Sequence, residues 1–522
     1  MKMQWIFKAS VAALLAVTPH MALAEWREAK TKHFHVYADM SEKALDEYID
    51  ALERYDAALR TLVQPRETLP LTIYIVSEVG DVQRLSRSST TAGFYRPTYT
   101  GPYFVGPENF RGGETMTARS IFFHEYAHHI LLSNADQFYP GWANEGLAEF
   151  FMSAKLGNDG SVTFGAPNSD RKYSMTGMSR WTAKDMLESD HRKLGRWEGI
   201  ERYTRGWLMV HYLLLGGERN GQLTQYINRI NAGEAPLKAG EAVFGDLNKL
   251  NSDLERYMRR SSIKTVTLQP KDFKTEAVIS NRALSAGHAA IMPYRIQSAS
   301  GVTEPEAKIL AQRAGPVGAQ YPNDAFVQRA MTEIYFDAKD YAAAEAAADR
   351  ALAVEPTNVD ALVYKGRIIA LRAKTSGAEA EWNKARSLFL KANKAQPDNP
   401  LPFVPYYDSF VAQGKTPPEG ALNGLLRAVV LVPQDDSLRL RATMAMINAN
   451  DLKTARRLLA AVAFSGHRGN ENPAFDLLEA IDRGDTKDQL LKIAQDKKFN
   501  LVNEFIDPPV ENADKKDDKQ KE

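Results

Sequence analysis

Proline recurs at near-regular intervals through the C-terminal part of this 522-residue chain, and this restricts what that part can fold into. Between residues 303 and 500 the composition is rich in alanine, leucine and other helix formers, interrupted by Pro322, Pro356, Pro397 and Pro433. The first interval is 34 residues and the next two are 41 and 36, and each accommodates two helices and a turn. Because one helical pair cannot bury its own apolar face, three or more must stack. We therefore expect residues 303–500 to form an all-α helical-repeat domain.

One of these units resembles a tetratricopeptide repeat. The 34-residue interval is the period of that family, and Tyr341-Ala342-Ala343-Ala344, followed by the segment Ala351 to Pro356, is similar to its second helix. The longer interval indicates an insertion near residues 373–380. The resemblance implies a surface that recruits a substrate or a protein partner. A helical array without a ligand groove is the alternative.

Residues 25–264 have a different pattern, which predicts strands mixed with helices. Short β-branched or aromatic runs indicate strands at 34–37 and 71–76, and a further edge strand or hairpin at 91–105. Apolar residues at helical spacing mark helices at 41–59, 118–132, 142–156, 203–215, 221–231 and 247–258. Residues 265–302 are expected to connect the two parts with some structure of their own. The predicted fold class is an α+β domain, with a mixed sheet plus helices, followed by the all-α repeats.

Composition excludes several classes of protein. Lys and Arg total 66 and Asp and Glu total 65, for a net charge of +1, so nothing attracts the chain to nucleic acid or to an anionic membrane. Cysteine is absent, which excludes disulfides, thiolate metal sites and a cysteine nucleophile. No later segment is apolar for the roughly 18 residues that a transmembrane helix needs. The charged, apolar-poor tail, residues 501–522, is expected to be disordered.

Residues 1–24 have the pattern of a signal peptide. Lys2 and Lys8 precede a short apolar run at 9–17, and Ala22-Leu23-Ala24 is a small-residue cleavage signature. The alternative is an uncleaved interfacial helix. The pattern predicts a periplasmic or secreted bacterial protein.

His124-Glu125-Tyr126-Ala127-His128 is an H-E-x-x-H motif. Residues four apart lie on one face of a helix, so both imidazoles can reach one metal ion. Glu125 lies beside them, where it can take a proton from a water molecule that the metal activates. Two helix histidines held by hydrogen bonds are the alternative. The motif predicts one Zn²⁺ ion as the cofactor.

A catalytic zinc ion needs a third protein ligand and an open position. Glu145 follows His128 by 17 positions, which leaves room for a loop and the start of a neighbouring helix, so its carboxylate would complete a His₂Glu site. Glu149 lies one turn later on the same face, placed to hold the outer nitrogen of a ligand histidine. A solvated helix glutamate is the alternative for both positions.

The H-E-x-x-H motif followed by Asn144-Glu145-Gly146-Leu147-Ala148 resembles the gluzincin metallopeptidases, the clan of thermolysin and the zinc aminopeptidases. In the aminopeptidase branch, a tyrosine in a Tyr-x-Lys-Gly helix start stabilises the tetrahedral intermediate. Tyr203-Thr204-Arg205-Gly206 is similar, with arginine in place of lysine, so the resemblance implies that Tyr203 donates a hydrogen bond to the oxyanion. An aromatic ring packed at a helix start is the alternative. The resemblance covers residues 92–260 at most.

The chain departs from the aminopeptidases in one respect. They carry a Gly-x-Met-Glu-Asn strand that binds the free amine of the substrate, and this chain has no such segment. Gly93, Phe94 and Tyr95 occupy the comparable place and are expected to bind an extended peptide by strand addition. The missing glutamate favours an endopeptidase.

The remaining histidines have no evident chemical role in the sequence. His129 lies one position off the ligand face and His211 lies two turns beyond Tyr203, so both are expected to be packing residues. No partner pattern is found for His33, His35, His191, His288 and His467.

Together these features predict an exported zinc metallopeptidase that hydrolyses peptide bonds with metal-activated water. The metal ligands are His124, His128 and Glu145, and the catalytic residues are Glu125 and Tyr203. Its substrate would be a protein or peptide. Two alternatives stay open: a non-enzymatic periplasmic adaptor with a structural or silent zinc domain, and a zinc hydrolase that acts on another amide, such as cell-wall peptide crosslinks.

Overall fold

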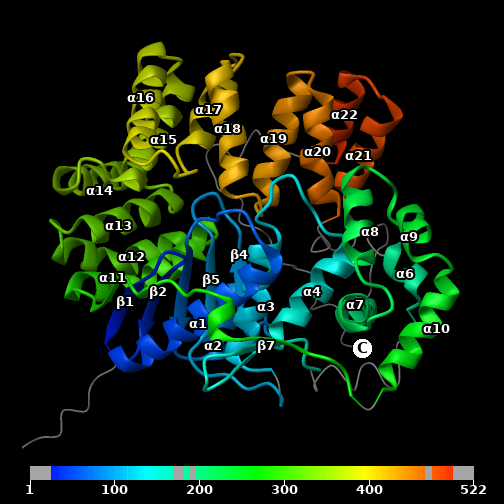
Figure 1. Cartoon of the computed structure of the whole chain (residues 1–522). Helices are drawn as coiled ribbons and strands as arrows, with labels where there is room; N and C mark the ends of the chain where they lie inside the picture. The colour runs from blue at the N-terminus through cyan, green and yellow to red at the C-terminus, as the bar shows by residue number, and fades with distance from the viewer. Residues whose placement is uncertain are drawn as a thin grey trace, which may run out of the picture.

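The computed structural model describes residues 25–114, 116–167, 181–188, 196–260, 262–464 and 473–497. The predicted signal peptide, His191, His467 and the predicted tail lie outside them. The described chain has two parts, an N-terminal part that combines a mixed sheet with helices and a C-terminal part that is helical throughout. The helical part arches over the first (Figure 1). This confirms the coarse prediction of an α+β region followed by an all-α region.

A six-stranded mixed sheet forms the base of the N-terminal part, in the order β4-β5-β3-β2-β1-β9. The central strands β2, β3 and β5 are parallel, and β4, β1 and β9 each run antiparallel to the strand beside them. These strands are β1 (Trp26–Lys30), β2 (Phe34–Asp39), β3 (Leu71–Val76), β4 (Phe94–Arg96), β5 (Tyr103–Pro107) and β9 (Ser280–Ala283). A small second sheet contains β6 (Lys155–Leu156), β7 (Val162–Phe164) and β8 (Val266–Leu268).

The N-terminal helices are α1 (Glu42–Val63), α2 (Val79–Ser86), α3 (Ala118–Leu131), α4 (Gly141–Met152), α6 (Ala183–Leu187), α7 (Arg196–Leu215), α8 (Gln222–Asn231), α9 (Pro236–Phe244) and α10 (Leu247–Met258), with a short 3₁₀ turn at Pro270–Asp272. Helices α1 and α2 alternate with the strands, and the remaining N-terminal helices lie between β5 and β9 in the chain. The helix predicted at 142–156 is wrong at its end. It stops at Met152, because the next residues pair with β7 instead.

Alternation along the strands sends side chains to two different cores. Val36 and Ile73 are paired across β2 and β3 and belong to the core that includes α1 and α3. Their neighbours Tyr37 and Tyr74 point to the opposite face and pack with α11 (Ala286–Ala299). The segment predicted as a connection therefore also contributes β9 to the sheet edge and α11 to the cover of its far face.

The C-terminal part continues as antiparallel helical pairs. Its helices are α12 (Glu304–Gln320), α13 (Ala325–Asp337), α14 (Tyr341–Val354), α15 (Val359–Ser376), α16 (Glu379–Ala395), α17 (Phe403–Ala412), α18 (Glu419–Leu431), α19 (Asp436–Asn448), α20 (Leu452–Ala463), α21 (Pro473–Arg483) and α22 (Lys487–Asp496). The four recurring prolines lie in the turns between pairs, as predicted, where no helical backbone hydrogen bond is lost to proline. Alanines on one face of α14 are fully buried against the adjoining helices.

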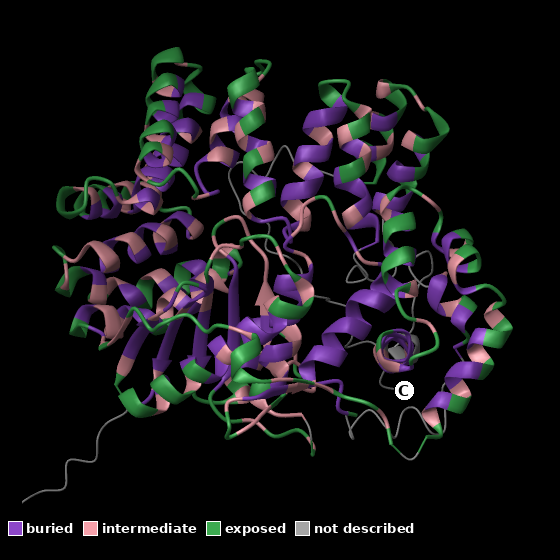
Figure 2. Ribbon diagram, in the orientation of Figure 1, coloured by how far each residue is buried: buried purple, intermediate pink, exposed green. Residues whose placement is uncertain are grey.

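The helical part contacts the N-terminal part at both of its ends. At the first end, Arg87, the residue after α2, forms an ion pair with Glu306 of α12 at 2.6 Å. At the other end, Gln434 donates to the backbone oxygen of His129 at 2.7 Å, and the rings of Phe138 and Phe464 stack 5.0 Å apart. Buried residues run from one part into the other there (Figure 2). Among the described residues, no helix combines the length and apolar character needed to span a bilayer.

Candidate metal centre

Helix α3 presents both motif histidines on one face. Thr117 caps its N-terminus in a reciprocal arrangement with Ser120. The opposite face is held in the core, where Phe123 stacks on Tyr55 with ring centroids 3.8 Å apart. The helix is thereby fixed from behind, and its imidazoles face α4.

Three ligand-type atoms converge between α3 and α4. Nε2 of His124 lies 3.2 Å from Nε2 of His128, and Oε2 of Glu145 lies 3.4 Å and 3.5 Å from these two nitrogens. His128 and Glu145 are buried. Tetrahedral zinc with bonds of about 2.05 Å holds its ligands about 3.3 Å apart. The three side chains therefore fit the donor set and the spacing of one zinc ion.

The outer nitrogens of both histidines face hydrogen-bond acceptors. Nδ1 of His128 lies 3.2 Å from Oδ1 of Asn144, and Nδ1 of His124 lies 3.7 Å from Oε1 of Glu149. At His128, an acceptor within hydrogen-bond distance keeps the proton at Nδ1 and leaves the Nε2 lone pair for a metal. The separation of His124 from Glu149 is longer than a hydrogen bond, so Glu149 acts on His124 by its charge. The sequence reasoning assigned the hydrogen-bonding role to Glu149 but missed Asn144, which precedes Glu145 directly in the same motif.

The electrostatics of the site favour a cation. Burial alone would lower the pKa of His124, but its hydrogen bond with Glu145 and the charges of Glu149, Glu145 and Glu125 outweigh burial and raise this pKa to about 9. In the ion-free form a proton therefore sits among these carboxylates. Glu125 itself is only partly buried, so it lies at the accessible side of the site.

Two glycines bring α7 against α4. A Cβ atom at Gly146 would lie 2.4 Å from the backbone oxygen of Gly206, and one at Gly206 would lie 2.5 Å from the backbone oxygen of Trp142. Only glycine permits this approach. It brings Tyr203 beside the histidines, with its ring centroid 5.9 Å from that of His124.

Arg205, which stands where the aminopeptidases have lysine, is buried in the fold. Its guanidinium donates to the backbone oxygen of Trp181 at 3.0 Å and forms an ion pair with Glu255 at 2.7 Å. The residue thus ties α7 to the segment before α6 and to α10.

Strand β4 lies at the edge of the main sheet, and its described partner is β5 alone. At Gly93, a Cβ atom would lie 2.7 Å from the Ile121 side chain, so this position passes close to α3 one turn before His124. Phe94 is buried, and the Tyr95 hydroxyl lies 2.8 Å from Nδ1 of His129. The side chains of this strand therefore serve packing, and peptide binding along its backbone stays a prediction.

His129 and His211 are neutral packing residues, as expected. Burial lowers the pKa of His129 to about 3. Burial also lowers the pKa of His211, whose Nε2 lies 3.0 Å from the backbone oxygen of Gly165 and whose Nδ1 lies 2.9 Å from the Tyr257 hydroxyl.

Three other histidines do have partners, which corrects the sequence reading. His35 lies 2.6 Å from Glu28, and His288 lies 3.2 Å from Asp324. His33 lies between two carboxylates of α1, 2.9 Å from Asp56 and 3.5 Å from Glu53. These partners lie on different elements of the fold, and linear spacing does not connect them.

The buried His33 group contacts α3 on the side away from the candidate metal centre. Asp56 also accepts a hydrogen bond from the Tyr126 hydroxyl of α3 at 2.5 Å. Burial opposes protonation of His33, but hydrogen bonds with Asp56 and Glu53 outweigh it and raise the pKa of His33 to about 9. The same three residues have the donor types of a metal site, and the imidazolium here supplies the positive charge that the carboxylates require.

Comparison of the chain with models of protein families and with curated proteins found no match.

Proposed function

We propose that this chain is a zinc-dependent hydrolase. The observation that carries the proposal is the spacing of 3.2 Å to 3.5 Å among Nε2 of His124, Nε2 of His128 and Oε2 of Glu145, which suits three ligands of one tetrahedral ion. When bound, zinc supplies a Lewis acid that polarises a substrate carbonyl and acidifies a water molecule.

Within that class, we propose an exported gluzincin-type endopeptidase. Glu125 takes the proton of the attacking water and then passes it to the leaving amine. Tyr203 donates a hydrogen bond to the oxygen on which negative charge develops. Asn144 and Glu149 orient the two imidazoles.

The remaining parts of the proposal concern the substrate. Strand β4 is the last strand of the sheet and lies next to α3, so its backbone could pair with an extended chain. The tetratricopeptide-like repeats recruit a protein substrate or a partner to the same molecule. Export follows from the predicted signal peptide.

The test separates metal binding from chemistry. Glu125→Gln is expected to keep one zinc ion per chain by elemental analysis while hydrolysis of labelled casein falls by about 10²–10⁴-fold. His128→Ala is expected to lose the zinc. Glu47→Gln, the same substitution on the exposed face of α1, is the matched control and should cleave as the unmodified protein does.

Two results would contradict the proposal. Undiminished cleavage by Glu125→Gln would remove the proposed base. A zinc-loaded chain that cleaves no substrate in a broad peptide panel would favour the adaptor alternative, in which the zinc is structural or silent.

A further inference from the structure

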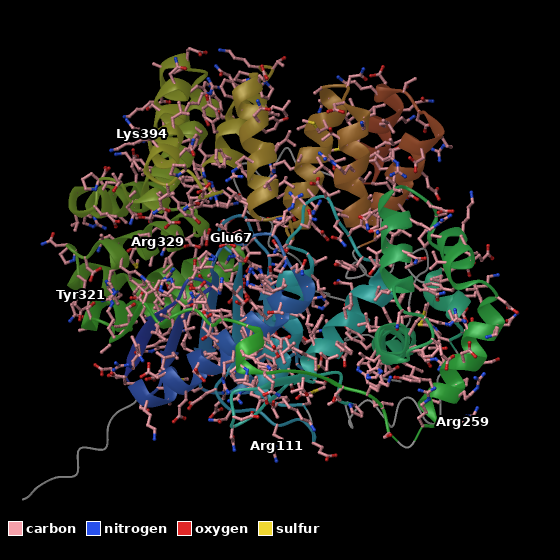
Figure 3. All side chains as sticks on the ribbon, in the orientation of Figure 1. Glu67, Arg111, Arg259, Tyr321, Arg329 and Lys394 are labelled. Atoms are coloured by element: carbon pink, nitrogen blue, oxygen red, sulfur yellow. The ribbon has the colours of Figure 1, made fainter. Side chains whose placement is uncertain are left out.

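A large cleft lies between the main sheet and the first helical pairs, on the side of the sheet opposite α3. It has a volume of about 1080 Å³. One wall comes from β1, β2 and β9, and the other comes from α11, α13 and the turns that follow α12, α14 and α16. Tyr321 and Arg329, both labelled in Figure 3, lie on the helical wall. We call this space the sheet–repeat cleft.

Most charges of the cleft are already paired. Glu28 receives Arg282 and His35 at 2.6 Å each and Lys30 at 3.1 Å. On the helical wall, Arg329 forms an ion pair with Asp360 at 2.6 Å. These cations are therefore occupied by acids of the same chain.

Arg295 of α11 differs from these cations. Its guanidinium lies 4.7 Å from the ring centroid of Phe326 and 5.4 Å from that of Tyr37. Its Nη1 atom is buried and has no hydrogen-bond partner, and no described carboxylate forms an ion pair with it. The Tyr37 hydroxyl interacts with the same guanidinium. Arg295 is only partly buried and lines the cleft, so a ligand in the cleft can supply an acceptor to a guanidinium that has no carboxylate partner.

A nearby acid does not neutralise Arg295 fully. Glu333 of α13 acts on it only through space, and burial raises the pKa of Glu333. The aromatic rings around Arg295 hold the guanidinium plane in place through cation–π contacts. A planar, fixed fork of donors suits a carboxylate, which it can bind with two parallel hydrogen bonds.

The other lining residues narrow the class of ligand. The four Lys and Arg side chains of the cleft are balanced by four Asp and Glu side chains, so the cleft does not attract a polyanion such as nucleic acid. Asn323, Asn358 and Gln396 come from three successive turns of the helical wall. The Asn358 amide caps α15 and donates to Glu355, and the Gln396 oxygen accepts from Asn399. The amide groups that these bonds leave over can serve the backbone of an extended peptide.

We propose that the sheet–repeat cleft binds a peptide carboxylate, with Arg295 as the anchoring cation. This site is separate from the candidate metal centre and does not depend on hydrolysis. In this proposal, a ligand of the helical repeats contacts the main sheet as well, because the sheet forms the second wall of the cleft.

Binding of short fluorescent peptides tests the proposal, measured by anisotropy with the full-length Glu125→Gln protein so that cleavage does not interfere. One pool has a free C-terminal carboxylate and no other acid, a second has an amidated C-terminus and one glutamate, and a third has an amidated C-terminus and no acid. The proposal expects the first or the second pool to bind, and their comparison shows whether the carboxylate is terminal or on a side chain. Equal binding of the third pool, or no binding of any pool, overturns it.

Variants add a second, independent arm. Arg295→Gln is expected to weaken binding about tenfold or more, and Arg295→Lys less so, because the charge stays but the fork is lost. Arg282→Gln is the matched control, since Arg282 is in the same cleft but is engaged by Glu28, and it should change binding less than about threefold by the same reasoning. Unchanged binding by a folded Arg295→Gln protein overturns the proposal. If that variant does not fold, the three pools decide the question on the unsubstituted cleft.

Discussion

Replacing Gly206 with alanine tests whether the close contact between α4 and α7 sets the geometry of the candidate metal centre. The new Cβ atom would lie 2.5 Å from the backbone oxygen of Trp142 and 3.3 Å from the Cα atom of Gly146. Ordinary contact begins near 3.4 Å, so the two helices must separate by about 0.9 Å locally. Both neighbours are backbone atoms, and no side chain can rotate away to relieve the contact.

The expected cost to stability is moderate. Overpacking a well-packed contact costs about 1–3 kcal/mol, and the better helix propensity of alanine offsets about 1 kcal/mol of this. The free energy of unfolding should therefore fall by about 0–2 kcal/mol. Tyr203 moves with α7, and a displacement of about 1 Å at a reacting group costs about 100-fold in rate.

The assay compares these two quantities in one variant. Urea unfolding of the zinc-loaded protein measures the change in stability, and peptide hydrolysis measures the change in rate. Gly420→Ala in α18 is the control, since nothing lies within 4 Å of its Cβ position, and it should leave the rate unchanged. If Gly206→Ala were as active as Gly420→Ala and equally stable, the contact would not position Tyr203 and the reasoning would be wrong.

Three further predictions concern Asn144 in the candidate metal centre and two residues that contact α3 or its neighbours, Gln434 and His33. Asn144→Ala should weaken zinc binding about 10- to 100-fold through loss of the contact with the outer nitrogen of His128, as measured by competition with a chelating dye, whereas an unchanged affinity would leave Asn144 without this role. Gln434→Ala should lower the free energy of unfolding by about 1–3 kcal/mol, because it leaves a buried backbone oxygen of α3 unsatisfied, and a urea midpoint like that of the unsubstituted protein would show that the contact is dispensable. The pKa of His33 is raised from an ordinary value near 6.5 to about 9, so its stabilisation is complete below about pH 6.5 and is lost as the pH rises through 9. Zinc-loaded protein should therefore lose on the order of 1–3 kcal/mol between these values, and His33→Gln should flatten that profile of urea midpoint against pH.

Local spacing predicted that His124, His128 and Glu145 lie together, because both helices are marked by short-range patterns. His124 and His128 are four apart on one helix, and Glu145 lies on the next helix, after the connection from Leu131 to Gly141. Asn144 stands in the same motif, but its role depends on the direction of one side chain, which spacing does not give. The turns between helical pairs were predictable because Pro322, Pro356, Pro397 and Pro433 recur at near-regular intervals; a single proline is a weaker signal, since Pro293 and Pro316 lie inside helices α11 and α12.

Features that depend on contacts between distant parts of the chain could not be predicted from local sequence patterns. Strand β9 has the sequence Ser-Asn-Arg-Ala, which carries no strand signal, and it is a strand because β1 offers it an open edge. His33 finds its carboxylates on α1, about twenty residues later, because the chain turns back across the sheet. The sheet–repeat cleft joins residues of β1 and α13 that lie some three hundred positions apart.

An array of helical pairs that is attached to the rest of a protein at one end only is flexible, because each pair contacts only its neighbours. Here Arg87 joins the first helix of the array to the end of α2, and Gln434 and Phe464 join later helices to the region of α3. Contacts at two separate places restrict bending of the helices between them. The sheet–repeat cleft lies along this restrained stretch, so the proposed binding of a peptide would require little ordering of the chain.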